Sequence, residues 1–263
     1  MEKPERKPVG KTLRALSWLV ESSTPEVGVR QLAAAMKIAP SSAHRILLAL
    51  SEAGFVRQDG KTQRYMLGGE FLRVAHLAVA KAPLRQAAME AMRRLVERCN
   101  ESALLAVYDD VRREMIFAAS VEPAHASQSA IQLNTWIPVR TGASGLAILA
   151  FLEDAEIQSV IRRVNVAPPA DRIFGEPDHL QTELATVRRQ GYALTRCQLI
   201  AGAVGLAAPI FNGNGKVVGD ICVTVPEQRF GEGSKDRLID ALLGSVNEVT
   251  KKIRSAGDGL WMV

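Results

Sequence analysis

The sequence predicts a mixed fold, in which an N-terminal winged helix-turn-helix domain is joined by a linker helix to an α/β domain with an antiparallel sheet. Two short helical patterns followed by a hairpin pattern predict the first domain. Strand-like runs flanked by helical ones, with a hairpin among the last strands, predict the second domain. The length of 263 residues suits two domains of ordinary size.

We expect the chain to be organised in five segments. They are a disordered basic tail at 1–10, the winged helix-turn-helix domain at 11–69, the linker helix at 70–82, the α/β domain at 83–255 and a C-terminal tail at 256–263. With 47% hydrophobic and 23% charged residues, the composition is that of a globular protein. The start MEKPERKPVG lacks the apolar core of a secretory signal, and no apolar run approaches the ~18 residues of a membrane helix. We therefore expect a cytoplasmic protein without a membrane partner.

The excess of basic residues lies entirely in the N-terminal part of the chain. Residues 1–75 carry 12 Lys and Arg against 7 Asp and Glu, whereas residues 76–263 carry 21 of each. This asymmetry predicts an anionic partner for the N-terminal domain. A solubilising tail is the alternative explanation, because Lys3, Arg6 and Lys7 belong to the segment that we expect to be disordered.

The first two helices are expected on either side of the break SSTPEVG at 22–28. Thr12 can cap the first helix, whose leucines share one face. The second helix spans 29–37 and presents an apolar face to the same core. Only two residues separate it from Pro40, which suits the first position of a third helix because its missing N–H would be unpaired there.

The third helix, within PSSAHRILLALSEAGFV at 40–56, combines an apolar face with a polar first turn. Its apolar residues have the i, i+3, i+4, i+7 spacing of a buried face: Ala43, Ile46, Leu47 and Leu50. Two helices joined by a turn of three or four residues, the second with a polar start, predict a helix-turn-helix. The stretch FVRQDGKTQRYML at 55–67 then has a hairpin pattern around Gly60, which predicts the wing of a winged helix.

The polar first turn of the third helix predicts contacts with DNA. An α-helix fits the major groove, its N-terminal residues reach base edges, and its free N–H groups can hold a phosphate. For Arg45 the alternative is a solvated surface arginine, and for His44 a packed or water-bonded role is an equal alternative. The candidate DNA-binding residues are Pro40, Ser41, Ser42, His44, Arg45, Lys61 and Arg64, of which the last two belong to the wing.

The pattern EFLRVAHLAVAKA at 70–82 predicts a helix with two apolar faces that ends before Pro83. One face can pack on its own domain through Phe71, Val74, Ala75 and Ala78. The other face, with Leu72 and Val79, would be exposed in a monomer. We therefore expect a homodimer or a homotetramer.

The segment after the linker helix alternates between strand and helix patterns. Strands are expected at 103–109, 114–120, 129–133, 192–197, 205–211 and 216–225. The turn NGNG joins the last two of these strands. Helices are expected near 154–164, 177–190 and 236–254, and the stretch GASGLAILAFL predicts a tight glycine loop that enters a further helix.

The sequence lacks the side-chain patterns of an enzyme active site. It contains no nucleophile elbow, phosphate loop, HExxH pattern or tight carboxylate pair, and GASG at 142–145 lacks the Lys-Ser/Thr of a phosphate loop. Cys99, Cys197 and Cys222 are widely spaced without a CxxC pair, so we expect free thiols, no metal site and no cofactor. Redox sensing by Cys197 and Cys222 is an alternative to ordinary strand packing.

Four stretches of the chain resemble the IclR family of bacterial transcription regulators. Residues 9–68 resemble its winged-helix half, with the Pro-Ser-Ser helix start and the wing that ends in Tyr-x-Leu-Gly. The stretches TGASGLAILAFL, LATVRRQGYALT and GAVGLAAPIFNGNGKVVGDICVTVP resemble, in order and spacing, segments of the family's effector-binding domain. The resemblance implies a GAF-like fold and an effector-binding role for residues 83–255.

The resemblance also implies where a small-molecule effector binds. The implied effector-binding residues are Thr141, Gly142, Ala143, Ser144, Thr195, Ala203, Gly205, Cys222 and Thr224. Ordinary sheet packing is the alternative for each of them. The chain departs from the family at Arg140, where a histidine is common, at Leu146, where a lysine is usual, and at Gln198, where a glutamate is frequent. The chemistry of the effector is therefore not carried over.

The sequence as a whole predicts a transcription regulator, and not an enzyme, whose binding to double-stranded operator DNA is modulated by a small-molecule effector in the C-terminal domain. Two alternatives stay open: a small-molecule enzyme fused to a winged helix, and an architectural DNA-binding protein that senses no ligand. A turnover assay would identify the first alternative. Thermal shift with a metabolite panel would identify the second, because a ligand that binds the folded state stabilises it.

Overall fold

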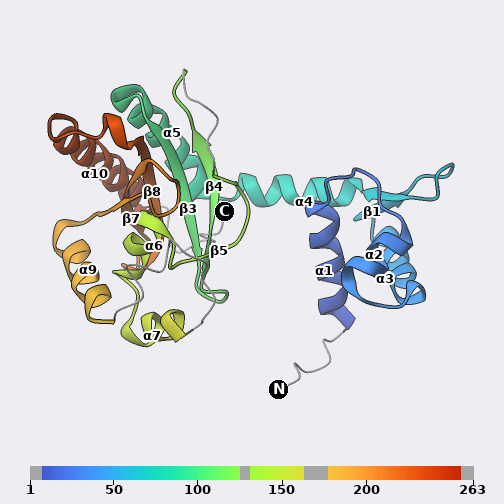
Figure 1. Cartoon of the computed structure of the whole chain (residues 1–263). Helices are drawn as coiled ribbons and strands as arrows, with labels where there is room; N and C mark the ends of the chain where they lie inside the picture. The colour runs from blue at the N-terminus through green and yellow to red at the C-terminus, as the bar shows by residue number, and fades with distance from the viewer. Residues whose placement is uncertain (1–7, 125–130, 163–176, 256–263) are drawn as a thin grey trace. The chain divides into compact units, whose positions relative to one another are not determined.

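The chain divides into two compact units, residues 1–81 and 82–263, in a computed structural model that describes residues 8–124, 131–162 and 177–255 (Figure 1). Most of the expected tail at 1–10 and all of the tail at 256–263 lie outside the described residues. Each unit has its own hydrophobic core. Within the described ranges, no helix is both long enough and apolar enough to cross a membrane.

The first unit is a helical core closed by a two-stranded hairpin. Its elements are α1 (Pro8–Glu21), α2 (Val29–Met36), α3 (Pro40–Glu52), β1 (Val56–Gln58), β2 (Tyr65–Leu67) and α4 (Gly69–Ala80). The two strands pair antiparallel, with Val56 opposite Leu67. Side chains from α1, α2, α3 and the hairpin meet in the core, among them Leu19, Leu32, Leu47, Val56 and Tyr65. The predicted winged helix-turn-helix fold is confirmed.

A tight turn between α2 and α3 forms the helix-turn-helix. Lys37 ends α2 in the left-handed conformation, with φ of 53°. Its N–H donates to the Ala34 carbonyl oxygen at 3.2 Å, and the N–H of Ile38 donates to that of Ala33 at 3.0 Å. Pro40 then begins α3, where a missing N–H leaves no helical hydrogen bond unmade. The helix start that the sequence predicts at Pro40 is confirmed.

The first helix begins earlier than expected. α1 starts at Pro8, so residues 8–10 of the expected disordered tail are helical. Thr12 lies inside the helix instead of capping it, and its hydroxyl donates to the Pro8 carbonyl oxygen at 3.3 Å. This i to i−4 hydrogen bond is typical of a threonine in a helix interior. A proline fits the first helical position, which explains why the helix extends back to Pro8.

α4 has no buried residue. Phe71 and Ala75 are half-buried, but Val74 and Ala78, which we expected on the same packed face, are exposed. The expectation that this whole face packs on its own domain is therefore wrong. The physical reason is that the unit offers α4 little more than the short strand β1 to pack against. Four apolar side chains of α4 keep 39% to 53% of their exposure: Leu72, Val74, Leu77 and Val79.

The second unit is a six-stranded antiparallel sheet with helices on both faces (Figure 1). The order along the sheet is β5-β4-β3-β8-β7-β6. The strands are β3 (Ser102–Asp109), β4 (Glu114–Val121), β5 (Ile137–Pro138), β6 (Ala193–Arg196), β7 (Ala203–Phe211) and β8 (Val217–Pro226). The predicted α/β domain with an antiparallel sheet is confirmed.

Alternate residues of the strands face two separate hydrophobic clusters. One cluster lies under α5 (Pro83–Cys99) and α10 (Glu232–Ser255), which follows the short 3-10 helix η1 (Glu227–Arg229). The other lies under α6 (Gly142–Leu149), α7 (Asp154–Arg162) and α9 (Pro177–Gln190). Because successive strand residues point to opposite faces, Leu104 and Cys222 share the second cluster while Leu105 and Val223 share the first.

Two elements of the second unit differ from expectation. α5 occupies a segment for which the patterns predict no element, because Pro83, interpreted as the stop of the linker helix, is the first residue of a new one. The strand expected at 129–133 is not formed over 131–133, and 129–130 lie outside the described residues. Asn134 adopts the left-handed conformation and donates its N–H to the Phe117 carbonyl oxygen, so the chain turns there. The short strand β5 pairs with β4 instead.

Helix α6 is buried along its whole length. Gly145 lies so close to the Val139 carbonyl oxygen that any side chain at this position would overlap it. On the sheet, a Cβ at Gly205 of β7 would be 3.2 Å from the Ala143 Cβ, a closer approach than most real Cβ contacts. The absence of a side chain at Gly205 allows α6 to lie directly on the sheet, and its absence at Gly145 allows the segment before α6 to pass close to the helix.

Candidate functional site

The first turn of α3 presents the predicted DNA-binding residues on the surface of the first unit. Four of them are exposed: Pro40, Ser41, His44 and Arg45. Ser42 is half-buried, and the other side of the helix is buried through Ala43, Leu47 and Leu50. His44 is therefore not packed in the core, which was one of the two alternatives left open by the sequence.

The tip of the wing is fixed by Asp59. Its Oδ1 accepts hydrogen bonds from the backbone N–H groups of Lys61 at 2.9 Å and Thr62 at 2.7 Å. These backbone hydrogen bonds lower the pKa of Asp59, because they stabilise its carboxylate form. Lys61 is exposed at this turn, which leaves its ammonium group accessible to a partner.

Arg64 is engaged inside its own unit. Its Nη2 donates to the Glu26 carbonyl oxygen at 3.0 Å and to Gln31 Oε1 at 2.8 Å, and its Nε lies 3.9 Å from the Glu26 carboxylate. These contacts connect the second strand of the wing to the segment that precedes α2. The side chain that the sequence assigned to a phosphate thus also attaches the wing to its unit, with 40% of its surface exposed.

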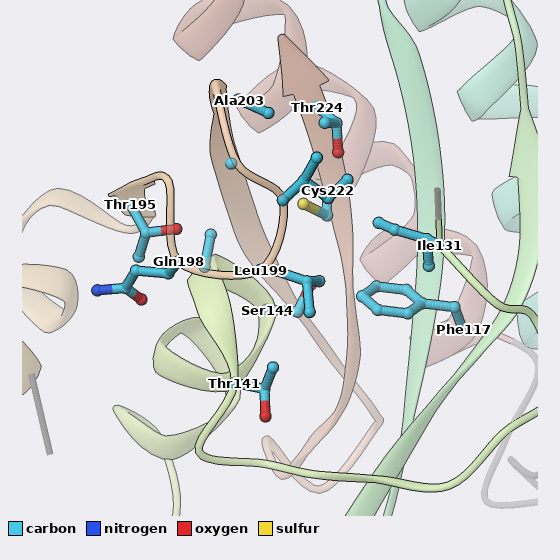
Figure 2. A pocket seen from close by; sticks show the side chains of 13 residues that line it. Phe117, Ile131, Thr141, Ser144, Thr195, Gln198, Leu199, Ala203, Cys222 and Thr224 are labelled. Carbon is cyan, nitrogen blue, oxygen red and sulfur yellow. The ribbon is translucent and has the colours of Figure 1, made fainter. Parts of the chain in front are cut away.

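The predicted effector-binding residues gather in the second unit around a cavity of ≈ 30 Å³ (Figure 2). Eight of the nine line it: Thr141, Ala143, Ser144, Thr195, Ala203, Gly205, Cys222 and Thr224. Gly142 is the exception, and a Cβ there would be 3.4 Å from the Leu199 Cβ. The cavity is large enough for a ligand of only a few non-hydrogen atoms as it stands.

Five further residues line the cavity: Phe117, Ile131, Gln198, Leu199 and Ile200. Gln198 is one of the departures from the family near the pocket, and the other four were missed in the sequence. Figure 2 shows Phe117 and Ile131 on the side of the cavity opposite Thr195. Gln198, Leu199 and Ile200 follow directly after β6, so their proximity to Thr195 could have been inferred. Phe117 and Ile131 come from β4 and the chain after it, and only the pairing of β3 with β8 brings them near Cys222.

The residues interpreted as a glycine loop are the first turn of a helix. Thr141 is the N-cap of α6, Gly142 begins the helix with φ of 61°, and Ala143 and Ser144 follow within its first turn. The first helical hydrogen bond runs from the Gly145 N–H to the Thr141 carbonyl oxygen at 3.1 Å. The earlier N–H groups have no intrahelical acceptor, which makes this end of α6 suited to an anionic ligand group.

The lining combines polar and apolar side chains without a formal charge. Hydroxyl groups of Thr141, Ser144, Thr195 and Thr224 and the Gln198 amide supply its polar atoms. Phe117, Ile131, Leu199 and Ile200 supply its apolar surface. Such a pocket fits a small organic molecule with an apolar body and one polar end.

A carboxyl group lies behind the cavity. Asp220 of β8 is fully buried, and its Oδ1 accepts a hydrogen bond from Ser144 Oγ at 2.9 Å. Its Oδ2 has no partner among the described residues. Burial raises the pKa of Asp220 to about 8, and the Ser144 hydrogen bond offsets only part of that effect.

The Cys222 thiol stays protonated in this environment. Burial, followed by the proximity of Asp220, raises its pKa to about 12. Because the thiolate is the reactive form of cysteine, this environment disfavours the redox alternative for Cys222. Cys197 is exposed, and its Sγ lies 3.3 Å from Glu227 Oε2.

A larger cavity, of ≈ 470 Å³, lies elsewhere in the second unit. Its lining includes Tyr108, Asp110, Glu153, Glu156 and Lys216. The Tyr108 hydroxyl donates to Glu156 Oε1 at 2.6 Å, so these two polar groups of the lining already bond to each other. Across the described ranges, no group of three or more His, Cys, Asp or Glu is placed to hold a metal ion.

Two family models match the chain. Residues 8–60 match the model described as the IclR helix-turn-helix domain. Residues 76–251 match the model described as Bacterial transcriptional regulator IclR C-terminal. Together they account for both units of the structure.

Individual proteins of known name are similar over nearly the whole chain. The transcriptional repressor IclR of Escherichia coli (strain K12) is 25% identical over 245 residues, covering 90% of this chain and 86% of that protein. A crystallised protein of Silicibacter sp. TM1040, described as an ICLR transcriptional regulator, is 26% identical with a TM-score of 0.79, covering 94% of this chain and 96% of that one. An IclR homolog from Microbacterium hydrocarbonoxydans, crystallised with 4-hydroxybenzoate, has a TM-score of 0.74 at 21% identity, covering 93% and 99%.

The buried carboxyl predicts a dependence of stability on pH. Folding raises the pKa of Asp220 from 3.8 to about 8. The free energy of unfolding that depends on this group is therefore highest below pH 3.8, where Asp220 is protonated in both states, and falls as the pH rises to about 8. Asp220→Asn removes this titration. Between pH 5 and 8 the wild type should lose stability relative to the variant by about 1.4 kcal/mol per pH unit, with no further relative loss above pH 8.

Thermal unfolding of both proteins followed by circular dichroism from pH 5 to 9 measures this difference. Other groups titrate equally in the two proteins and cancel in the comparison. If the melting temperatures of the two proteins differ by the same amount at every pH in this range, Asp220 is ionised in the folded protein throughout.

Proposed function

Since the chain belongs to the IclR family of bacterial transcriptional regulators, we propose that its N-terminal unit binds double-stranded operator DNA and that a small molecule in its C-terminal unit modulates this binding. The single observation that carries the DNA proposal is the exposed polar first turn of α3 beside an exposed Lys61 on the wing. The effector proposal is carried by the cavity at the first turn of α6.

On the DNA side, the exposed residues and the half-buried Ser42 share the contacts. Arg45 contacts a base edge or a phosphate in the major groove, and Ser41 and Ser42 contact phosphate or bases from the same turn. Pro40 and His44 lie in the same exposed turn and complete the contact surface. Lys61 contacts a backbone phosphate from the wing. The excess of basic residues in the N-terminal part supports these assignments.

Arg64 is assigned a different role from Lys61. Its Nη2 donates both hydrogen bonds to its own unit, while 40% of the side chain stays exposed. We therefore infer that it holds the wing in place for Lys61 and can contact a phosphate through its other N–H groups.

On the ligand side, the α6 N-terminus and the hydroxyl groups of the lining favour a small anionic molecule. Thr195, Ser144 and Thr224 come from three different elements, so a ligand bound by them would link α6, β6 and β8. That an IclR homolog was crystallised with 4-hydroxybenzoate supports a carboxylate among the classes to be tested. Effector and operator then influence each other's affinity by the same factor.

The protein acts as a regulator and not as an enzyme, and it requires no cofactor. The similar proteins of known name are transcription regulators, which supports this reading. The pocket's thiol is held in its unreactive form. A protein whose partner is bacterial operator DNA acts in the cytoplasm. An architectural DNA-binding protein that senses no ligand stays as the second candidate. The search for an effector described below tests it.

The oligomeric state that fits this function is a homodimer, with a tetramer as its further assembly. The exposed apolar side chains of α4 give the first unit an apolar surface that a partner copy would cover. α1 also exposes Val9 and Leu13, at 69% and 60%. Two first units would then bind two operator half-sites, about 34 Å or a multiple of that apart.

The DNA proposal predicts different effects for Arg45→Ala and Lys61→Ala. DNA that co-purifies with the protein is sequenced to identify the operator, and affinity is then measured against salt concentration. Arg45→Ala should weaken specific binding by about 1 to 3 kcal/mol if it contacts a base, with the fold intact. Lys61→Ala should weaken binding to every sequence and reduce the salt slope by about one unit.

The matched control is Arg93→Ala, which removes an exposed arginine from α5 of the second unit and should leave both quantities unchanged. If Arg45→Ala and Lys61→Ala both bind operator like wild type at all salt concentrations, this surface does not bind DNA.

The effector proposal predicts that changes at the cavity remove the response to a ligand but not the binding of operator. Thr224→Val removes a hydroxyl group at nearly constant volume, which leaves a polar ligand atom unpaired at a cost of about 1 to 3 kcal/mol. Ala203→Leu adds volume at the cavity and should exclude the ligand. The ligand is found by thermal shift with a panel of small carboxylic acids, and operator affinity is then measured with and without it.

Tyr108→Phe serves as the control, because it alters the larger cavity only. Loss of the response in Tyr108→Phe, with a normal response in Thr224→Val, would move the effector to that cavity. A wild type that responds to no compound by either measurement would favour the architectural candidate.

The assembly proposal predicts that Leu72→Glu combined with Leu77→Glu yields monomers. A charge on each of two exposed apolar positions of α4 cannot be buried without a large desolvation cost. Multi-angle light scattering at micromolar concentration measures the mass, and Leu72→Met with Leu77→Met is the apolar control, which should assemble like wild type. A monomeric wild type, with and without operator DNA, contradicts the proposal.

A further inference from the structure

Among the described residues of the second unit, Asp220 is a carboxyl group with no exposure, and it accepts a hydrogen bond from Ser144. It lies two residues before Cys222 on β8 and so on the same face of the sheet. Ser144 also lines the small cavity. One hydroxyl group therefore lies between this carboxyl group and the pocket.

We propose that Asp220 determines which ligands this pocket accepts. The pocket binds an anionic ligand, and one proton is taken up with it and held between Asp220 and Ser144. This inference rests on the proposed function, because it concerns the ligand of the effector pocket. It adds the charge of that ligand and a dependence of its binding on pH.

The surroundings of Asp220 supply no positive charge among the described residues. The residues opposite it on the adjacent strands are Ala106 of β3 and Pro209 of β7, and α6 has no ionisable side chain. The titratable group that interacts with it is the Cys222 thiol, which is neutral. Ionisable side chains of the neighbouring elements are bonded elsewhere: Tyr108 of β3 to Glu156, Arg140 before α6 to the Ile161 carbonyl oxygen, and Arg188 of α9 to that of Ala150.

The Ser144 hydroxyl has a single hydrogen, and the state of Asp220 decides where it points. When Asp220 is ionised it can only accept, so Ser144 donates to it and turns lone pairs toward the cavity. When Asp220 is protonated it can donate to Ser144 Oγ instead, and the Ser144 hydrogen becomes free for a ligand. An anionic ligand oxygen requires that second arrangement.

Electrostatic repulsion favours the same state. An anion at the first turn of α6 and an ionised Asp220 would be two like charges on either side of one hydroxyl group, in an interior of low dielectric constant. Binding of the anion therefore raises the proton affinity of Asp220. Above the pKa of Asp220, the protein with ionised Asp220 therefore binds the ligand anion and one proton together, and Asp220 is neutral in the complex.

The test uses sodium acetate as the probe, because acetate is small enough for the cavity and is ionised at both pH 6 and pH 9. Acetamide, of nearly the same shape but neutral, is the ligand control. Apparent affinities are obtained from melting temperature against probe concentration at constant ionic strength. The proteins are wild type, Asp220→Asn and Thr224→Val, and Asp220→Ala replaces Asp220→Asn if that variant does not fold.

For wild type, the apparent dissociation constant of acetate should be about tenfold higher at pH 9 than at pH 6, because only about a tenth of Asp220 with a pKa of about 8 is protonated at pH 9. Asp220→Asn should bind acetate equally at both pH values. Thr224→Val should bind more weakly but keep the pH dependence, since it leaves Asp220 and Ser144 in place. Acetamide binding should not depend on pH in any of the proteins.

Two results would overturn the inference, and they differ in what they leave standing. Equal acetate affinity of wild type at pH 6 and pH 9 removes the role of Asp220 but leaves the effector pocket intact. No stabilisation of wild type by acetate at pH 6 shows that the pocket does not take a small anion, and the proposed ligand class falls with it.

Discussion

The direct packing of helix α6 on the six-stranded sheet is the contact on which the functional part of the second unit depends. It requires a residue without a side chain at Gly205 of β7, beside Ala143. Gly145 in turn allows the segment before α6 to pass close to the helix at the Val139 carbonyl oxygen. The same approach places the first turn of α6 over Thr195, Cys222 and the other lining residues. A helix held further from the sheet would leave its N–H groups without a shaped cavity around them.

That packing also isolates the carboxyl group of Asp220. A buried polar group without compensation costs several kcal/mol, whereas one hydrogen bond such as that from Ser144 contributes about 1 kcal/mol, so burial decides its pKa. A neutral aliphatic residue at this position would pack with Ala106 and Pro209 at no such cost. An uncompensated carboxyl group beside a ligand pocket is therefore a feature that ligand binding can use, and Ser144 is the group through which it would act.

In the first unit, three basic side chains that look alike in the sequence differ in what surrounds them. Arg45 and Lys61 are exposed, while Arg64 is bonded to Glu26 and Gln31. The wing is a short hairpin of two three-residue strands, so a fixed attachment to the helical core lowers its mobility. Attachment by one arginine and presentation of one lysine are thus complementary parts of the same surface.

Local signals in the sequence identified the turn before Pro40, the wing around Gly60 and the strands β3, β4, β6, β7 and β8, but not β5. Family resemblance identified eight of the residues that line the cavity. The direction of Arg64, the presence of Phe117 and Ile131 in the lining and the isolation of Asp220 depend on the folded arrangement of the chain. The physical reason is that periodicity and turn chemistry act over a few residues. Which acceptor an arginine meets, or whether a carboxyl group finds a cation, depends on strands and helices paired across long separations in the chain.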